Sequence, residues 1–105
     1  MHIEINTSNF TYSDSLESHV YESIDRTFGR YADHVTRVEI HLADLNGDMK
    51  SGPDDKRCLI EARPAGLNPL VVEDRNSDFY EAVANATDKM RTVLEKRLAH
   101  ERRPV

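Results

Sequence analysis

Basic side chains recur at helical spacing in the last quarter of the chain. Lys89, Lys96 and Arg103 stand seven residues apart, a spacing that places them on one flank of a helix. Arg91 and Arg97 add positive charge to the same segment. Rows of ammonium and guanidinium groups neutralise phosphates, so this segment predicts binding to a polyanion, with nucleic acid as the first candidate. The plain alternative is a solvated helix flank that binds no ligand.

An earlier helical segment carries a second group of basic side chains. His19, Arg26 and Arg30 fall on one flank of that segment by helical geometry. If this flank adjoins the flank of Lys89, Lys96 and Arg103, the two helices form one composite basic patch. The 105-residue chain nevertheless has a formal net charge of -5, which repels phosphate at long range. Any contact with nucleic acid is therefore expected to be local and sensitive to salt.

A secondary candidate patch lies on a strand-like segment and consists of Lys56, Arg57 and Arg63. These residues offer contacts to phosphates or carboxylates. Strand alternation puts Arg57 and Arg63 on the face opposite Cys58 and Ile60. We favour cross-strand ion pairing for this face, with binding to a partner as the alternative.

Motifs for catalysis or metal binding are not apparent in the sequence. Cys58 is the only cysteine, and a lone cysteine on the apolar side of a strand is expected in the core. The five histidines show no spacing typical of metal ligands. Residues 44–48 resemble the start of a calcium-binding loop, but Met49 stands where that loop needs glycine, so an acidic hairpin tip is favoured over a metal-responsive module. We expect no enzyme, no cofactor, no bound metal and no small-molecule substrate.

Hydrophobic periodicity predicts the elements that position these side chains. Alternating apolar residues predict strands at 2–6, 37–42 and 58–62, and a short apolar run predicts another at 70–72. Four-residue spacing from Leu16 to Phe28 predicts a helix that is capped by Ser13 and weakened or ended at Gly29. A second helix is predicted over residues 78–103, with Ser77 or Asp78 as its cap. Its apolar face is predicted to contain Phe79, Val83, Ala86, Met90, Val93 and Leu94.

This order of elements predicts an α+β fold, a β-α-β-β-β-α sandwich in which both helices cover one face of a four-stranded mixed sheet. The helical crossover permits a parallel first pair, and the remaining strands pair as antiparallel neighbours. Residues 1–105 are expected to form a single domain, with a long, mobile hairpin loop near residues 43–56. No segment is typical of a membrane span or a signal peptide, so a cytoplasmic protein without a membrane partner is the default expectation.

Several sequence blocks resemble the ribosome hibernation-promoting factors and ribosome-associated translation inhibitors, also called sigma-54 modulation proteins. The blocks are SDSL at residues 13–16, YADHV at 31–35, RVEI at 37–40, DFYEAV at 78–83 and DKM at 88–90. The resemblance covers nearly the whole chain, and the block that starts at residue 78 is the most specific part of it.

The resemblance implies the same fold, which is similar to a double-stranded-RNA-binding domain. It also implies a protein that binds the small ribosomal subunit and its RNA in the channel used by messenger and transfer RNA. Such a protein blocks translation in resting cells, as in stress or stationary phase, by occupying space rather than by catalysis. Lys89 and Lys96 match basic positions of the family's second helix and Arg26 matches approximately, whereas Thr92 stands where an arginine is common.

Two further expectations concern partners. Because the sequence stops soon after the second helix, it is expected to lack the carboxy-terminal domain with which long family members pair ribosomes. The alternative function is a non-ribosomal protein-interaction module that has the same fold and uses its acidic loop or its open sheet face. The net charge of -5 and the replacement of helix-one lysines by residues such as Ser23 and Asp25 motivate this alternative.

Overall fold

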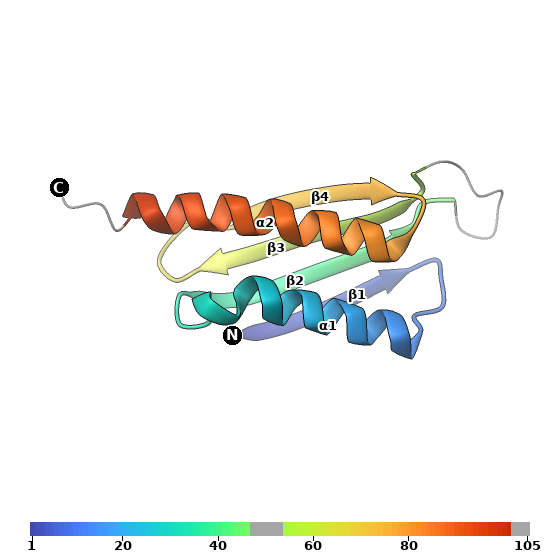
Figure 1. The fold of residues 1–105 in the computed structure, drawn as a ribbon, viewed down its shortest axis with the longest axis horizontal. Coiled ribbons are helices and arrows are strands. Elements are labelled where there is room, and N and C mark those ends of the chain that lie inside the picture. Colours follow the sequence, from blue (N-terminus) through green and yellow to red (C-terminus); the bar gives the residue numbers. More distant parts are fainter. Residues whose placement is uncertain (47–53, 102–105) are drawn as a thin grey trace.

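The computed structural model describes residues 1–46 and 54–101, and it describes side chains as far as residue 99. The elements in chain order are β1 (His2–Ser8), α1 (Asp14–Phe28), the short 3-10 turn η1 (Gly29–Tyr31), β2 (Val35–Asp44), β3 (Lys56–Pro64), β4 (Leu70–Asn76) and α2 (Phe79–Glu101). This order confirms the predicted β-α-β-β-β-α arrangement. Figure 1 shows both helices on one face of the sheet, with α1 over the β1 and β2 side and α2 over the β3 and β4 side.

The four strands lie in the order β1-β2-β3-β4. β1 pairs with β2 in parallel, whereas β2–β3 and β3–β4 are antiparallel pairs, which confirms the predicted mixed sheet. The register aligns Ile5 with Ile40, Ile40 with Ile60, and Ile60 with Val72. A continuous apolar row therefore crosses all four strands, and both helices are needed to cover it.

Local capping interactions set the starts of both helices. The Ser13 side chain accepts a hydrogen bond from the Leu16 backbone N–H at 3.2 Å, as predicted for the start of α1. At the start of α2, the Asp78 carboxylate accepts a hydrogen bond from the Tyr80 N–H at 3.1 Å, so Asp78 is the cap rather than Ser77. At Gly29 the α-helix ends, and the chain continues through one further turn as η1.

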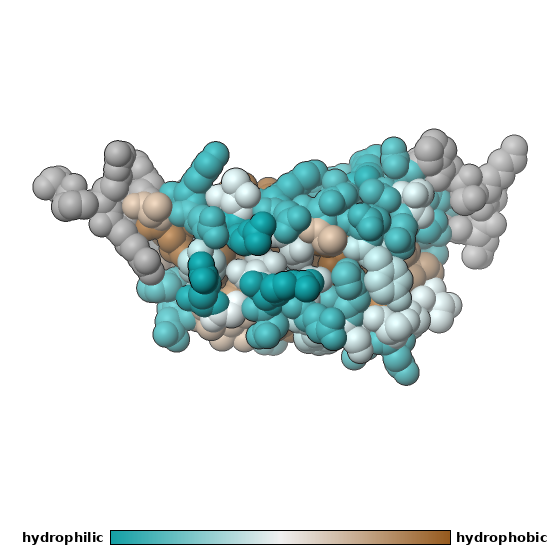
Figure 2. All heavy atoms as spheres, in the orientation of Figure 1, coloured by the Kyte–Doolittle hydropathy of each residue, from teal (hydrophilic) through white to brown (hydrophobic). Residues whose placement is uncertain are grey.

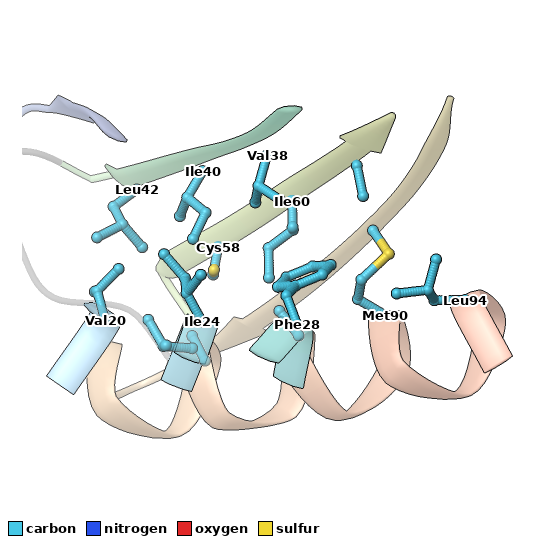
Figure 3. Close-up of a cluster of buried hydrophobic side chains, with 14 of the residues drawn as sticks. Val20, Ile24, Phe28, Val38, Ile40, Leu42, Cys58, Ile60, Met90 and Leu94 are labelled. Atoms are coloured by element: carbon cyan, nitrogen blue, oxygen red, sulfur yellow. The ribbon is translucent and has the colours of Figure 1, made fainter. Parts of the chain in front are cut away.

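The hydrophobic core lies between the helices and the sheet. Figure 3 shows Phe28 of α1 and Met90 of α2 with Ile40, Cys58 and Ile60 of the strands. All five side chains are fully buried. Cys58 is therefore a core residue, as predicted.

Val93 was predicted to lie on the buried face of the second helix, and this prediction is wrong, because its side chain is 36% exposed. Successive helix residues are rotated by about 100°, so Val93 falls at the margin of the stripe formed by Met90 and Leu94. Leu98 was not among the predicted core residues, but it is buried one turn after Leu94.

The strands are also longer than the side-chain alternation predicted. β1 continues to Ser8 and β4 to Asn76, because backbone pairing with Ala43 and Lys56 persists after the apolar pattern has ended. The loop predicted near residues 43–56 is shorter for the same reason, because Asp44 of β2 pairs with Lys56 of β3. Its tip, residues 47–53, lies outside the described residues.

Truncation of Phe28 tests how far the helices depend on this core. We expect Phe28→Ala to lower the free energy of unfolding by about 3–5 kcal/mol, because it removes a fully buried ring. Urea unfolding followed by circular dichroism measures this loss. Val71→Ala is the control, because Val71 is 57% exposed and its truncation should change stability by no more than about 0.5 kcal/mol. Equal losses in both variants would contradict this description of the core.

Candidate nucleic-acid interface

A groove of about 450 Å³ lies between the carboxy-terminal end of α1 with η1 and the second half of α2. Its lining residues are Arg26, Thr27, Arg30, Tyr31, Arg91, Thr92 and Glu95. We call this site the inter-helix groove. Figure 2 shows the helix-covered face, where hydrophilic residues predominate along the boundary between the two helices.

The inter-helix groove carries three guanidinium groups and one carboxylate. Arg26 donates a hydrogen bond from Nη2 to the Ser23 hydroxyl at 3.4 Å, which leaves its positive charge uncompensated. Within the described part of the chain, neither Arg26 nor Arg30 forms an ion pair with a carboxylate. Arg91 lies 3.4 Å from the Asp88 carboxylate, but both side chains are more than half exposed, so this ion pair is weak. The groove is thus locally positive on an acidic protein.

Among the side chains that the structure describes, Glu95 is the one acidic residue that lines the groove. The hydroxyl of Tyr31 donates a hydrogen bond to Glu95 Oε1 at 3.2 Å. Tyr31 also packs against the hydrophobic core. Because the core holds the Tyr31 ring in place, the hydrogen bond from its hydroxyl helps to position the Glu95 carboxylate. Glu95 and Tyr31 were not identified as site residues from the sequence. For Glu95, the helical spacing could have indicated this position, because Glu95 follows Arg91 by one helical turn and therefore lies on the same flank of α2.

Lys89 does not line the inter-helix groove. Its ammonium group donates hydrogen bonds to the Glu73 backbone carbonyl at 2.8 Å and to Asp74 Oδ1 at 3.0 Å, and both residues belong to β4. Asn85 donates to the other oxygen of Asp74 at 3.1 Å. Lys89 therefore links α2 to the edge strand β4 through hydrogen bonds. The flank of α2 that it occupies faces away from α1.

The other basic candidates of α2 lie at different places. Lys96 is exposed and follows Lys89 by seven residues, so it shares the β4-side flank. Arg97 is half-buried, and Arg103 lies outside the described residues. The composite patch was expected to join His19, Arg26 and Arg30 to Lys89, Lys96 and Arg103. Among the described residues, Lys89 and Lys96 do not lie beside Arg26 and Arg30, so they do not form this patch. Arg91 takes the position opposite α1 that Lys89 was expected to have.

His19 contributes to packing between the helices instead of to the groove. Its Nε2 lies 3.1 Å from the Tyr80 backbone carbonyl oxygen, and the two rings are 5.0 Å apart. The hydroxyls of Ser15 and Tyr80 lie 3.0 Å apart. These contacts join the first two turns of α1 to the first turn of α2 and hold the two helices side by side.

The secondary candidate patch is divided between the two faces of the sheet. Lys56 alternates with Arg57 and lies beside Asp44 and Asp55, with ion pairs of 3.2 Å and 2.9 Å. The hydrogen bond to Asp55 is the main cause of the raised pKa of Lys56. This ammonium group closes the base of the β2–β3 hairpin, where the Leu45 N–H also donates to the Asp55 carbonyl at 2.8 Å.

Arg57 and Arg63 lie on the open face of the sheet, where ion pairs neutralise them. Arg57 pairs with Glu73 across strands at 3.1 Å, and Arg63 pairs with Glu61 at 3.0 Å. Arg75 also pairs with Glu73, and its hydrogen bond is the first cause of the lowered pKa of that carboxyl. The favoured structural interpretation of this face is therefore confirmed for Arg57. Use of the face or of the acidic loop by a protein partner stays a prediction.

The arrangement is suited to binding rather than to bond chemistry. Guanidinium groups form paired hydrogen bonds with phosphate oxygens, and the inter-helix groove displays three of them. In the described ranges 1–46 and 54–101, no group of three or more histidine, cysteine or acidic side chains is placed to hold a metal ion. No helix in those ranges is long and apolar enough to cross a membrane.

Two solved structures have the same fold as this chain. The Protein Y N-terminal domain of Thermus thermophilus superposes with a TM-score of 0.73 at 22% identity, over 91% of this chain and 98% of that one. A ribosomal subunit interface protein from Coxiella burnetii superposes with a TM-score of 0.76 at 19% identity, over 94% and 99%. These likenesses show that the chain has the same α+β fold as these two proteins, with a four-stranded sheet covered by two helices.

Residues 3–102 match the family described as sigma 54 modulation protein / S30EA ribosomal protein. The chain belongs to this family, which confirms the resemblance seen in the sequence. It is also 21% identical over 90 residues to the chloroplastic ribosome-binding factor PSRP1 of Spinacia oleracea. That alignment covers 86% of this chain but 28% of the relative, so this chain spans less than a third of the relative's length.

Replacement of the two lysines on the β4-side flank of α2 separates a structural role from a surface position. We expect Lys89→Ala to lower the free energy of unfolding by about 1 kcal/mol, because it removes the hydrogen bonds to Glu73 and Asp74. Lys96→Ala is the matched control and should change stability by less than about 0.5 kcal/mol. Urea unfolding measures both variants. A Lys89→Ala variant as stable as Lys96→Ala would show that the hydrogen bonds between Lys89 and β4 contribute nothing to the free energy of unfolding.

The buried thiol of Cys58 predicts a loss of stability in alkali. Burial, with a smaller contribution from the Asp74 charge, raises the pKa of Cys58 from 9.0 to about 12. Well below pH 9.0 the thiol is protonated in both the folded and the unfolded chain, so it has no effect on the pH dependence. Between these two values only the unfolded chain releases the proton, and the Cys58 contribution to stability therefore falls as the pH rises.

Comparison with Cys58→Val isolates this effect from other groups that titrate in alkali. The difference in free energy of unfolding between the wild type and the variant should be constant below pH 9.0 and should shift against the wild type above it. Urea titrations at a series of pH values provide the measurement. Parallel curves through the alkaline range would contradict the burial of the thiol.

Proposed function

We propose that this protein binds the small ribosomal subunit, occupies the channel used by messenger and transfer RNA, and blocks translation in resting cells. The observation that carries the proposal is the inter-helix groove, which presents Arg26, Arg30 and Arg91 on a fold of the S30EA family. The proposed setting is the cytoplasm, in stress or stationary phase. The names of two relatives, a ribosome-binding factor and a ribosomal subunit interface protein, support a ribosomal partner.

The mechanism needs occupancy of space and contacts to phosphate, and no bond is made or broken. A folded domain in an RNA channel excludes other occupants by its volume alone. Guanidinium groups that neutralise ribosomal RNA phosphates release counterions, which gives affinity and makes that affinity depend on salt. These contacts carry little sequence information, so the shape of the RNA surface selects the site.

The charge distribution supports the helix-covered face as the RNA-binding face. On the open sheet face the arginines are held by carboxylates, as in the pairs Arg57–Glu73 and Arg63–Glu61. A phosphate that approached this face would compete with partners already in place. In the inter-helix groove, by contrast, Arg26 and Arg30 have no carboxylate partner among the described residues. The net charge of -5 then limits binding at long range without preventing local contact.

Ribosome co-sedimentation tests the role of the groove. We expect Arg26→Ala/Arg91→Ala to weaken ribosome binding by at least about tenfold at moderate salt. The same variant should reduce the slope of log affinity against log salt by about 1–2, because up to two phosphate contacts are lost. Sedimentation with purified small subunits over a series of salt concentrations gives both quantities.

Arg63→Ala/Arg75→Ala is the matched control, because it removes the same charge from the open sheet face. This variant should retain the affinity of the wild type within about threefold. If both double variants lose equal affinity, total charge controls binding and the groove is not the RNA site. If neither double variant loses affinity, the inter-helix groove does not contact the ribosome.

A further inference from the structure

The inter-helix groove has the dimensions of a site for a small ligand. Its volume of about 450 Å³ lies within the range of roughly 300–1,000 Å³ that is typical of small-molecule sites. A helix flank that only touches an RNA backbone does not require such a depression. The arrangement of charge within the groove indicates which chemistry fits it.

Guanidinium groups stand on both walls of the groove. Arg26 and Arg30 are separated by one turn of helical chain at the end of α1, whereas Arg91 projects from α2. A single phosphate bound on one wall satisfies only part of this set. A chain of linked phosphates carries oxygens along its length and is able to engage both walls at once.

The walls are held in place by the packing of the fold. Thr27 in the groove is 8% exposed, and its neighbour Phe28 is fully buried in the core. On α2, Met90 precedes Arg91 and is fully buried as well. The backbones that carry the arginines are therefore fixed before a ligand arrives, which lowers the entropic cost of binding.

We propose that the inter-helix groove binds a free oligophosphate, the linear phosphate chain of a nucleoside triphosphate or of inorganic polyphosphate, and that this ligand excludes RNA. The second clause rests on the proposed function, whereas the first concerns the isolated protein alone. The base of a nucleotide is not recognised, because Tyr31 is the only aromatic residue in the lining and its hydroxyl is held by Glu95. The number of linked phosphates determines the affinity.

Glu95 restricts this affinity. Its carboxylate lines the same groove and repels phosphate oxygens. Glu95→Gln removes the charge but keeps a carbonyl oxygen that accepts the hydrogen bond of Tyr31. The substitution is therefore expected to tighten oligophosphate binding, a gain that damage to the fold does not produce.

Isothermal titration calorimetry of the full chain at low salt, without magnesium, tests the proposal. Tripolyphosphate and ATP are expected to bind with affinities within about threefold of each other, and AMP at least about tenfold more weakly. Arg26→Ala/Arg91→Ala should lose at least about tenfold in affinity for tripolyphosphate, and Glu95→Gln should gain about threefold. Arg63→Ala/Arg75→Ala should bind as the wild type does.

Three results would overturn the oligophosphate site. They are equal loss in the two double arginine variants, unchanged affinity in Glu95→Gln, and AMP binding as tight as ATP. Displacement of a labelled single-stranded RNA by tripolyphosphate tests the exclusion of RNA, and simultaneous binding of both would refute it. Groove-dependent tripolyphosphate binding without any ribosome binding would refute the ribosomal proposal and leave the oligophosphate site standing. Ribosome binding without tripolyphosphate binding would refute the oligophosphate site and leave the ribosomal proposal standing.

Discussion

Coverage of one apolar sheet face by two helices is the constraint on which the other features depend. The row Ile5, Ile40, Ile60 and Val72 crosses all four strands, and a single helix is too narrow to remove it from water. α1 and α2 therefore lie side by side on this face (Figure 1). Their adjacent flanks become the walls of the inter-helix groove, whereas the outer flank of α2 meets β4. The flank that a charged side chain of α2 occupies therefore decides whether it lines the groove, as Arg91 does, or contacts β4, as Lys89 does.

The same constraint explains how an acidic chain presents a basic site. Charged residues on the open sheet face find partners on the next strand or two residues along their own strand, as the ion pairs of Arg37 with Glu4 at 3.0 Å and with Glu39 at 2.7 Å illustrate. The hydrogen bond from Arg37 is the main cause of the lowered pKa of Glu39. Arg26 and Arg30, at the groove end of α1, form no ion pair among the described residues, and the carboxylate of Glu95 on the facing flank of α2 accepts a hydrogen bond from Tyr31 instead. Positive charge is thus left unpaired where the helices meet.

The fold was predictable from the sequence because apolar periodicity and capping residues act locally. Ser13 and the spacing from Leu16 to Phe28 defined α1, and alternation defined the strands to within a few residues. The candidate site was predictable only in part. Helical geometry grouped Arg26 with Arg30, but it did not reveal that Lys89 faces Asp74. That contact depends on the distance between α2 and β4, which only tertiary packing determines.

The difference between arginine and lysine on the two flanks of α2 follows from what each flank contacts. Lys89 donates to a carbonyl and a carboxylate of two successive residues of β4, and a flexible stem with a compact ammonium group suits this link between the helix and the strand. Arg91 stands over an open groove, where a rigid fork of donors is better matched to phosphate oxygens. A lysine at this position would keep the charge and lose the paired geometry. The proposed recognition of phosphate therefore depends on the identity of the basic residue and on its flank, and the net charge of the chain predicts neither.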